Sequence, residues 1–346
     1  MLNRKIFVSM TAVLGIICIA CGSYAVEDQY ELYPSIGKKE KYPEMTETEG
    51  EYEAGDRFVF DLSSSLETGY DTNAYLEHYD EAASIFLQNA VGVETRSLIF
   101  EECVLRLAYD MTYLDYLRFA EPDLFDNIFT VGLDTQVTEK ILWSLDYSLD
   151  LVGYPHDEAS EYSISEIETG LKHSISDGLY HRLVYRYSNK EYTKWKIRNR
   201  VGTVQSSDRE DKRNTIKYEM GYYMTDRTFL KPEFTVYFND SNEAFIDYYD
   251  YTSIQTQLTG IHFLTDKIFT RLNAGYQYKS YDNRVVSDQD RGDQRDHLLS
   301  AGVSLFYDLN KNISLGTNFD YRKNFSNENS QKYTDYIMSC GIYYTY

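Results

Sequence analysis

Residues 141–151 read ILWSLDYSLDL, and their alternation indicates the fold class of the chain. The odd positions from Ile141 to Leu151 are large and apolar, whereas the even positions from Ser144 to Asp150 are serine or aspartate. A β-strand points successive side chains to opposite faces, so this strand has one apolar face and one anionic face. A soluble sheet would bury the apolar face. A membrane barrel would turn that face toward lipid and keep the acids inside.

Similar alternation recurs along the chain and predicts fourteen antiparallel strands. They span residues 57–70, 82–95, 98–112, 124–137, 141–151, 161–173, 179–192, 213–224, 228–239, 248–263, 267–279, 294–308, 312–323 and 332–346. Short links alternate with longer ones, as in a transmembrane up-and-down β-barrel with short periplasmic turns and long extracellular loops. Pro232 conflicts with this pattern, because a central strand needs the N–H group that proline lacks. We expect a bulge or a shifted strand boundary there.

Residues 1–25 predict a secretory signal peptide that is cleaved near Ala25. A short basic start precedes an apolar run at residues 6–20, and small residues precede the cleavage point. An uncleaved anchor helix and a lipid-modified Cys21 are the alternatives. We therefore expect an exported protein of the bacterial outer membrane.

Two further segments follow the signal peptide. Residues 26–56 are polar and acidic without a strand period, which predicts a flexible periplasmic tail. A pore plug or a partner-binding segment is the alternative for this tail. Residues 57–346 form the predicted barrel, with the lipid bilayer and the barrel-assembly machinery as its expected partners.

The composition narrows the class of partner. The formal charge of −21 becomes −23 when Arg4 and Lys5 leave with the signal peptide, which argues against nucleic acid. Tyrosine is abundant, at 35 of 346 residues, and it favours both strands and membrane interfaces. Cys103 and Cys340 are too few for a disulfide framework, and no cluster of residues has the spacing of a zinc site.

The C-terminal segment favours a membrane barrel over a soluble sandwich. One face of the last predicted strand carries Tyr336, Met338, Cys340, Ile342, Tyr344 and Tyr346. Burial of tyrosine hydroxyls in a dry core is unfavourable, whereas lipid headgroups can form hydrogen bonds with them. A final aromatic residue after alternating apolar residues resembles the C-terminal signal of outer-membrane barrels. That resemblance assigns Tyr344 and Tyr346 to recognition by the assembly machinery.

The segment Gly69-Tyr70-Asp71-Thr72-Asn73-Ala74-Tyr75 resembles a Gly-Tyr-Asp-x-Asn-x-aromatic segment of the β-barrel porin 2 family. The predicted strand lengths over residues 57–346 also fit that family. The resemblance implies an outer-membrane barrel associated with exopolysaccharide production and export. The alternative is that Gly69, Asp71 and Asn73 only form a turn.

Charged residues with inward parity are the candidate lining of a channel. The acidic wall comprises Asp126, Asp134, Asp146, Asp150, Glu166 and Glu168. The basic row comprises Arg182, Arg186, Lys194, Lys196, Arg198, Arg200, Lys217 and Lys231. An acidic wall facing a basic one would orient and filter polar solutes. One alternative is that opposite charges on adjacent strands simply pair with each other in a wet interior. A separate alternative is that the basic residues at positions 190–200 bind the phosphates of lipopolysaccharide.

These patterns favour a porin-like channel for hydrophilic solutes, with saccharides or exopolysaccharide as candidates and without a cofactor or metal. The second hypothesis is a non-conducting component of a polysaccharide export complex, whose tail binds a periplasmic partner. An outer-membrane hydrolase is the third, and we expect no enzyme because Gly-x-Ser-x-Gly and a clear Ser/His pairing are missing. His181, His262 and His297 have lipid-facing parity near strand ends, which indicates interfacial anchors.

Overall fold

The computed structural model describes residues 58–76, 82–100, 103–120, 122–158, 160–245, 247–286 and 292–346. The predicted signal peptide and acidic tail lie outside these ranges, so both stay predictions. Within the described ranges, no helix is long and apolar enough to cross a membrane.

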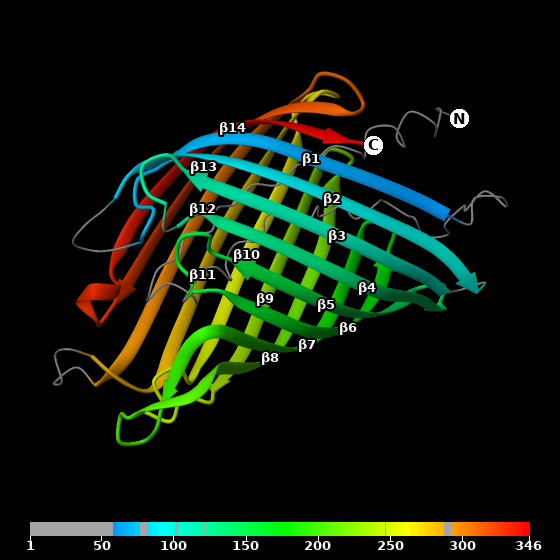
Figure 1. The fold of residues 1–346 in the computed structure, drawn as a ribbon. Helices are drawn as coiled ribbons and strands as arrows, with labels where there is room; N and C mark the ends of the chain where they lie inside the picture. Colours follow the sequence, from blue (N-terminus) through cyan, green and yellow to red (C-terminus); the bar gives the residue numbers. More distant parts are fainter. Residues whose placement is uncertain are drawn as a thin grey trace, which may run out of the picture.

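Fourteen antiparallel strands of the described residues close into one barrel, as the alternation predicted (Figure 1). They are β1 (Phe58–Asp71), β2 (Ser84–Phe100), β3 (Cys103–Tyr116), β4 (Leu124–Thr138), β5 (Ile141–Gly153), β6 (Tyr162–Ser176), β7 (Leu179–Arg198), β8 (Val204–Thr225), β9 (Thr228–Ser241), β10 (Tyr251–Phe263), β11 (Ile268–Val285), β12 (Asp293–Asp308), β13 (Ile313–Ser326) and β14 (Tyr333–Thr345). Turns of two to four residues alternate with connections of five to twelve residues. We call the two ends of the barrel the turn end and the loop end.

The largest departure from the predicted strands is the hairpin of β7 and β8. The chain between residues 192 and 213 was expected to be a long link, yet both strands continue through it to a short connection after Arg198. Residues 205–213 carry polar side chains at every position, so no apolar face marked the extension of β8. A register shift lies between Glu191 and Lys196 in β7. The hairpin reaches beyond the rest of the loop end, at the lower left of Figure 1.

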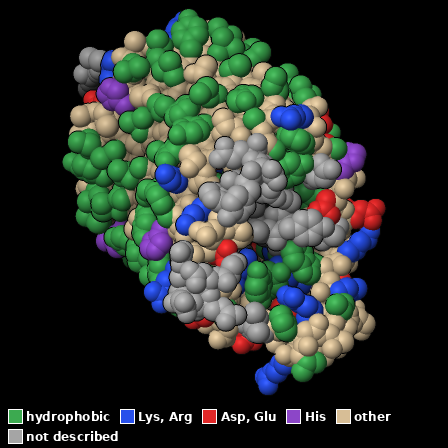
Figure 2. All heavy atoms as spheres, turned by 90° about the vertical axis from the view of Figure 1, so that its left-hand side faces the viewer, with side chains coloured by type: hydrophobic (Ala, Val, Ile, Leu, Met, Phe, Trp, Pro, Cys, Tyr) green, Lys and Arg blue, Asp and Glu red, His purple; other side chains and the backbone are tan. Residues whose placement is uncertain are grey.

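The alternation in β5 gives two faces of opposite character. Tyr147 and Leu151 are 47% and 41% exposed, whereas Ser144 is buried. The other strands also expose apolar side chains at alternate positions, which gives the barrel an apolar outer belt. Figure 2 looks onto the loop end and shows hydrophobic side chains over the flank, with charged side chains around the rim. The apolar face of the opening stretch therefore points outward, as a membrane barrel requires.

Pro232 lies within β9 without the expected bulge or boundary shift. Glu219 opposes Glu233 and Tyr222 opposes Leu230, so the β8–β9 register is the same on both sides of the proline. Among the described residues, the two ladder positions between these pairs have no β8–β9 pairing, while the β9–β10 ladder continues through Pro232. The missing N–H group interrupts one ladder locally, and the intact ladder on the other side holds the strand straight.

The barrel closes where β14 pairs with β1. Their register runs from Ser63 opposite Thr345 to Asp71 opposite Ile337. Beyond it, Leu62 and Tyr346 exchange backbone hydrogen bonds of 3.1 and 2.8 Å. The Tyr346 side chain is 70% exposed. The terminal aromatic thus lies at the closing seam, and its recognition by an assembly machinery stays a prediction.

The two larger apolar clusters of the described residues occupy the interior at opposite ends, and β14 is the strand that contributes to both. The loop-end cluster comprises Ala74, Phe86, Leu114, Tyr116, Leu124, Val152, Tyr154 and Ile337. The turn-end cluster comprises Phe229, Ile261, Phe269, Phe306 and Tyr343. Polar side chains occupy the inner faces between these clusters. The middle of the barrel therefore has a polar interior.

The Gly69–Tyr75 segment is explained by packing at the loop end of β1. A Cβ atom on Gly69 would lie 2.3 Å from the Phe86 ring, so the close approach of that ring requires glycine. Asp71 accepts hydrogen bonds from the backbone N–H of Asn73, at 2.8 Å, and from the Tyr116 hydroxyl, at 2.9 Å. Asp71 and Asn73 are fully buried. These residues hold the strand end and the following turn.

Candidate functional site

A cavity of about 520 Å³ lies among the inner faces of β1 to β10. Its described lining has eight carboxylates and six cationic side chains, which gives a formal charge of −2. The charged residues are Asp61, Glu94, Asp110, Asp134, Asp146, Glu166, Glu168, Glu219, Arg106, Lys172, Arg182, Arg186, Lys217 and Lys231. Such a surface is costly in a dry core, so the cavity is suited to water and polar solutes.

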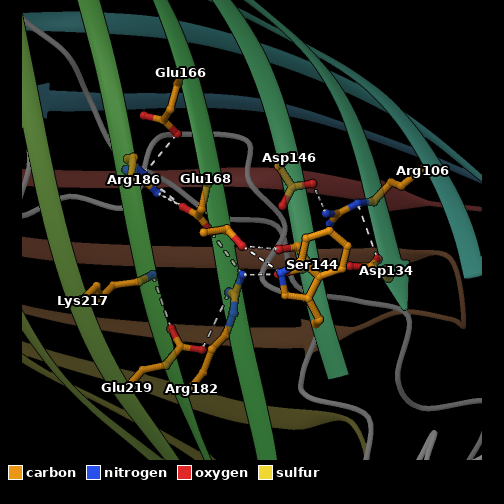
Figure 3. Close-up of polar contacts among 12 residues, drawn as sticks. Arg106, Asp134, Ser144, Asp146, Glu166, Glu168, Arg182, Arg186, Lys217 and Glu219 are labelled. Carbon is orange, nitrogen blue, oxygen red and sulfur yellow. Dashed lines mark hydrogen bonds and ion pairs between the residues drawn. The ribbon is translucent and has the colours of Figure 1, made fainter. Parts of the chain in front are cut away.

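The first group of charges is a triad on β3, β4 and β5. Arg106 donates a hydrogen bond from Nη2 to Asp146, and its Nε atom lies 3.9 Å from Asp134 (Figure 3). Gly132 makes room for this arrangement, because a Cβ atom there would lie 2.9 Å from Arg106 Nη2. Two carboxylates share one guanidinium, so the triad has a formal charge of −1.

The second group is a continuous chain of alternating charges across β6 to β9, which we call the charge chain. It begins where Arg186 bridges Glu166, at 3.1 Å, and Glu168, at 2.6 Å (Figure 3). Arg182 then joins Glu168, at 3.1 Å, to Glu219, at 3.9 Å. Each guanidinium lies between two carboxylates from neighbouring strands.

The charge chain continues onto β9 through two lysines. Lys217 lies 3.3 Å from Glu219 and 3.7 Å from Glu233, and Lys231 lies 3.9 Å from Glu233. The chain therefore has four carboxylates and four cations, and its formal charge is zero. The net negative charge of the lining comes from the β1–β5 side.

The acidic wall and the basic row are thus interleaved, as the pairing alternative anticipated. Neighbouring strands lie about 4.8 Å apart. A long charged side chain therefore contacts a partner at the same height on the adjacent strand before it can reach the opposite wall of the barrel. Asp134, Asp146, Glu166 and Glu168 line the cavity, whereas Asp126 and Asp150 lie toward the loop end and outside its lining. The β1–β5 side of the lining nevertheless carries a formal charge of −4 and the β6–β10 side a formal charge of +2, so a transverse field across the cavity stays a prediction.

The outer part of the basic row meets carboxylates of the loop end. Lys194 contacts Glu158, Lys196 lies 2.7 Å from Asp208, and Arg198 lies 2.9 Å from Glu243. The contact with Lys194 lowers the pKa of Glu158 below its usual range. Arg200 is exposed near the hairpin tip. These four residues lie outside the cavity lining.

Arg209 at the loop end was missed because its segment was expected to be a loop. It is 1% exposed and forms two hydrogen bonds with Asp211, of 3.0 and 2.5 Å. Its guanidinium lies 3.4 Å from the centre of the Tyr249 ring and 4.6 Å from that of Tyr192. Cation–π contacts of this kind stabilise the extended hairpin at the loop end.

The histidines with lipid-facing parity contact neighbouring polar side chains. His181 Nε2 lies 3.0 Å from His173 Nδ1, while His262 contacts Thr228 at 2.9 Å. His297 contacts the Tyr276 hydroxyl at 2.7 Å. The predicted interfacial role of the three histidines stays a prediction. Among the described residues, no group of three or more His, Cys, Asp or Glu side chains is placed to hold a metal ion.

Comparison with solved structures gives proteins of bacterial outer membranes and a toluene transporter as similar structures. The outer membrane channel DcaP of Acinetobacter baumannii matches with a TM-score of 0.51 and 8% identity, covering 84% of this chain and 97% of that chain. The outer membrane protein OmpT of Vibrio cholerae matches at 0.47 with 12% identity, over 84% and 98% of the two chains. The toluene transporter TodX of Pseudomonas putida matches at 0.42 with 9% identity, over 84% and 90%.

Comparison with families and curated proteins gives no relative. No family model matches the chain, and no curated protein matches it. The resemblance of Gly69–Tyr75 to the β-barrel porin 2 family therefore gains no support from these comparisons. The likeness to DcaP, at 8% identity, shows the fold alone, and that fold is a closed antiparallel β-barrel.

Proposed function

We propose that the protein is a channel of the bacterial outer membrane that passes small hydrophilic solutes. The observation that carries this proposal is the charged cavity of about 520 Å³ inside a closed barrel with an apolar outer belt. Lipid favours the outer face, and water and polar solutes favour the inner face. The predicted signal peptide and terminal aromatic agree with export and assembly in that membrane.

The charges of the lining support a weak preference for cations. The charge chain is neutral, so it offers no strong field of one sign to passing ions. The triad on β3 to β5 and the other acids of that side leave the lining with a formal charge of −2. Mixed charges held in pairs favour passage of uncharged polar molecules and small ions over large ions of one sign. Saccharides are the finer proposal for the solute, and the porin 2 resemblance adds exopolysaccharide as a candidate.

Planar-bilayer conductance tests the channel function. We expect steady single-channel currents with a modest cation preference in a salt gradient. Neutralising the cavity acids in Asp134→Asn/Asp146→Asn should reduce that preference. The matched control is Lys194→Gln/Lys196→Gln, which also changes two charges but outside the cavity lining, and it should leave the preference almost unchanged.

Two outcomes contradict the proposal. A folded barrel that carries no current would instead favour a non-conducting component of an export or assembly complex. A current whose ion preference ignores the cavity acids but follows Lys194 and Lys196 would move the selectivity site to the loop end. That second outcome would also restore the proposal that the outer basic row meets solutes or lipopolysaccharide.

A further inference from the structure

The two sides of the cavity lining differ in their balance of acids and cations. The strands β1 to β5 contribute five carboxylates and one guanidinium to the lining, whereas β6 to β10 contribute three carboxylates and five cations. The formal charges of the two sides are therefore −4 and +2. Arg96 and Glu233 lie outside the lining but pair with residues of it, and counting them gives −3 and +1. The two sides thus have opposite formal charges on either count.

The negative side contains two triads that each have one carboxylate in excess. The triad of Arg106 on β3 to β5 is the first. In the second, on β1 and β2, Arg96 lies 3.4 Å from Asp61 and 2.5 Å from Glu94. One guanidinium neutralises one of two carboxylates, so each triad keeps a formal charge of −1. The four acidic side chains are 16% to 32% exposed, so a cation in the cavity can reach them.

Lys172 on β6 supplies the excess cation of the positive side. Its ammonium group lies 4.5 Å from the centre of the Tyr180 ring, and within the described part of the chain it forms no ion pair. The charge of Glu219 also acts on Lys172. That carboxylate already lies 3.3 Å from Lys217 and 3.9 Å from Arg182, within the neutral charge chain. Lys172 is half-buried and lines the cavity, so its ammonium group can receive a carboxylate from the lumen.

A second lysine has a similar setting outside the cavity. The ammonium group of Lys190 on β7 lies 3.6 Å from the centre of the Tyr162 ring, and this lysine is also half-buried. Lys190 does not line the cavity. The two lysines are thus alike in type, burial and aromatic contact. They differ in their access to the cavity.

We propose that the cavity selects small zwitterions, such as amino acids, by holding their ammonium group toward the two triads and their carboxylate toward Lys172. This inference rests on the proposed channel function and names its solute class. A zwitterion has no net charge but a large dipole, so a field between sides of opposite charge both orients and stabilises it. An uncharged saccharide gains much less from such a field. Neutral saccharides are therefore the alternative that the test must exclude.

The test compares the entry of two isomers into proteoliposomes, measured by osmotic swelling. β-Alanine is a zwitterion, whereas lactamide has the same atoms and no charged group. We expect β-alanine to enter faster than lactamide through the wild-type barrel, after the rates for protein-free vesicles are subtracted. In Lys172→Met, the ratio of the two rates should fall about threefold to fivefold, the effect of one partly solvated ion pair. Lys190→Met is the matched control and should keep the wild-type ratio.

A second variant and a second readout keep the outcomes separate. Glu94→Gln removes the excess charge of the triad on β1 and β2 and should also lower the ratio, so it decides the matter if Lys172→Met fails to fold. Equal entry of the two isomers through the wild-type barrel, or a ratio unchanged in both variants, would overturn the inference. If neither isomer enters faster than into protein-free vesicles, the channel proposal fails. Titration calorimetry with the refolded wild-type barrel then decides the cavity: heat from β-alanine alone supports the inference, and equal heats from both isomers overturn it.

Discussion

Removal of Arg186 should both destabilise the barrel and change its ion preference. In Arg186→Met, Glu166 and Glu168 lose a guanidinium that lies 3.1 and 2.6 Å away. Methionine keeps the apolar stem, so the change isolates the charge. Breaking a buried ion pair by removing one partner typically costs about 3–5 kcal/mol, because a charge is left buried and uncompensated.

The exposure of the three side chains reduces that figure. Arg186 is 33% exposed, and Glu166 and Glu168 are 17% and 11% exposed, so water of the lumen screens part of the interaction. We therefore expect the free energy of unfolding to fall by about 2–3 kcal/mol. The formal charge of the lining changes from −2 to −3, so the cation preference should increase.

Urea unfolding in lipid vesicles, followed by tryptophan fluorescence, measures the stability. Planar-bilayer reversal potentials measure the ion preference. The double variant Arg186→Met/Glu168→Gln restores the wild-type formal charge and should recover about half of the lost stability. A loss below about 0.5 kcal/mol, or a double variant no more stable than Arg186→Met, would refute the view that the charge chain is held together by these pairs.

Three further changes test the packing, the outer face and the loop end. Gly69→Ala should lower the free energy of unfolding by about 1–3 kcal/mol, since the added Cβ meets the Phe86 ring, and Phe86→Leu should relieve part of that loss in the same urea assay. Ile167→Arg, on the outer face of β6, should cost about 2–4 kcal/mol near the bilayer midplane, and wild-type yield and stability in vesicles would contradict the lipid-facing assignment. Burial raises the pKa of Asp250 from 3.8 to about 6, so its contribution to stability is full below pH 3.8 and is lost as the pH rises through 6. The free energy of unfolding in the same urea assay should therefore fall between pH 4 and 7, and this pH dependence should be absent in Asp250→Asn.

Most strands could be predicted because the alternation of apolar and polar side chains can be read within each strand and recurs along the chain. In β5, β9 and β12, apolar and polar residues alternate from one position to the next. The predicted ranges of these strands lie within two residues of the observed ends. The extension of β8 was not predictable, because residues 205–213 are polar on both faces and show no apolar alternation. Pro232 led to the expectation of a bulge or a shifted strand boundary, and neither is present. The sequence of one strand does not tell which of its two ladders loses a hydrogen bond.

The candidate site was predictable only in part. Parity placed Glu166, Glu168 and Arg186 on inner faces, but contact between them depends on register across strands, which the sequence leaves open.

The seam between β1 and β14 also has a kinetic consequence. Nine residue pairs join these strands, against fourteen between β1 and β2. Every other ladder forms between strands that follow each other in the chain. The seam joins the first and the last strand, which are separated by nearly the whole barrel sequence. Closing a loop of roughly 280 residues costs about 2 kcal/mol more entropy than closing a hairpin of roughly 20 residues. The seam should therefore form last during folding and open first under load, so that closure of the barrel is a single late event.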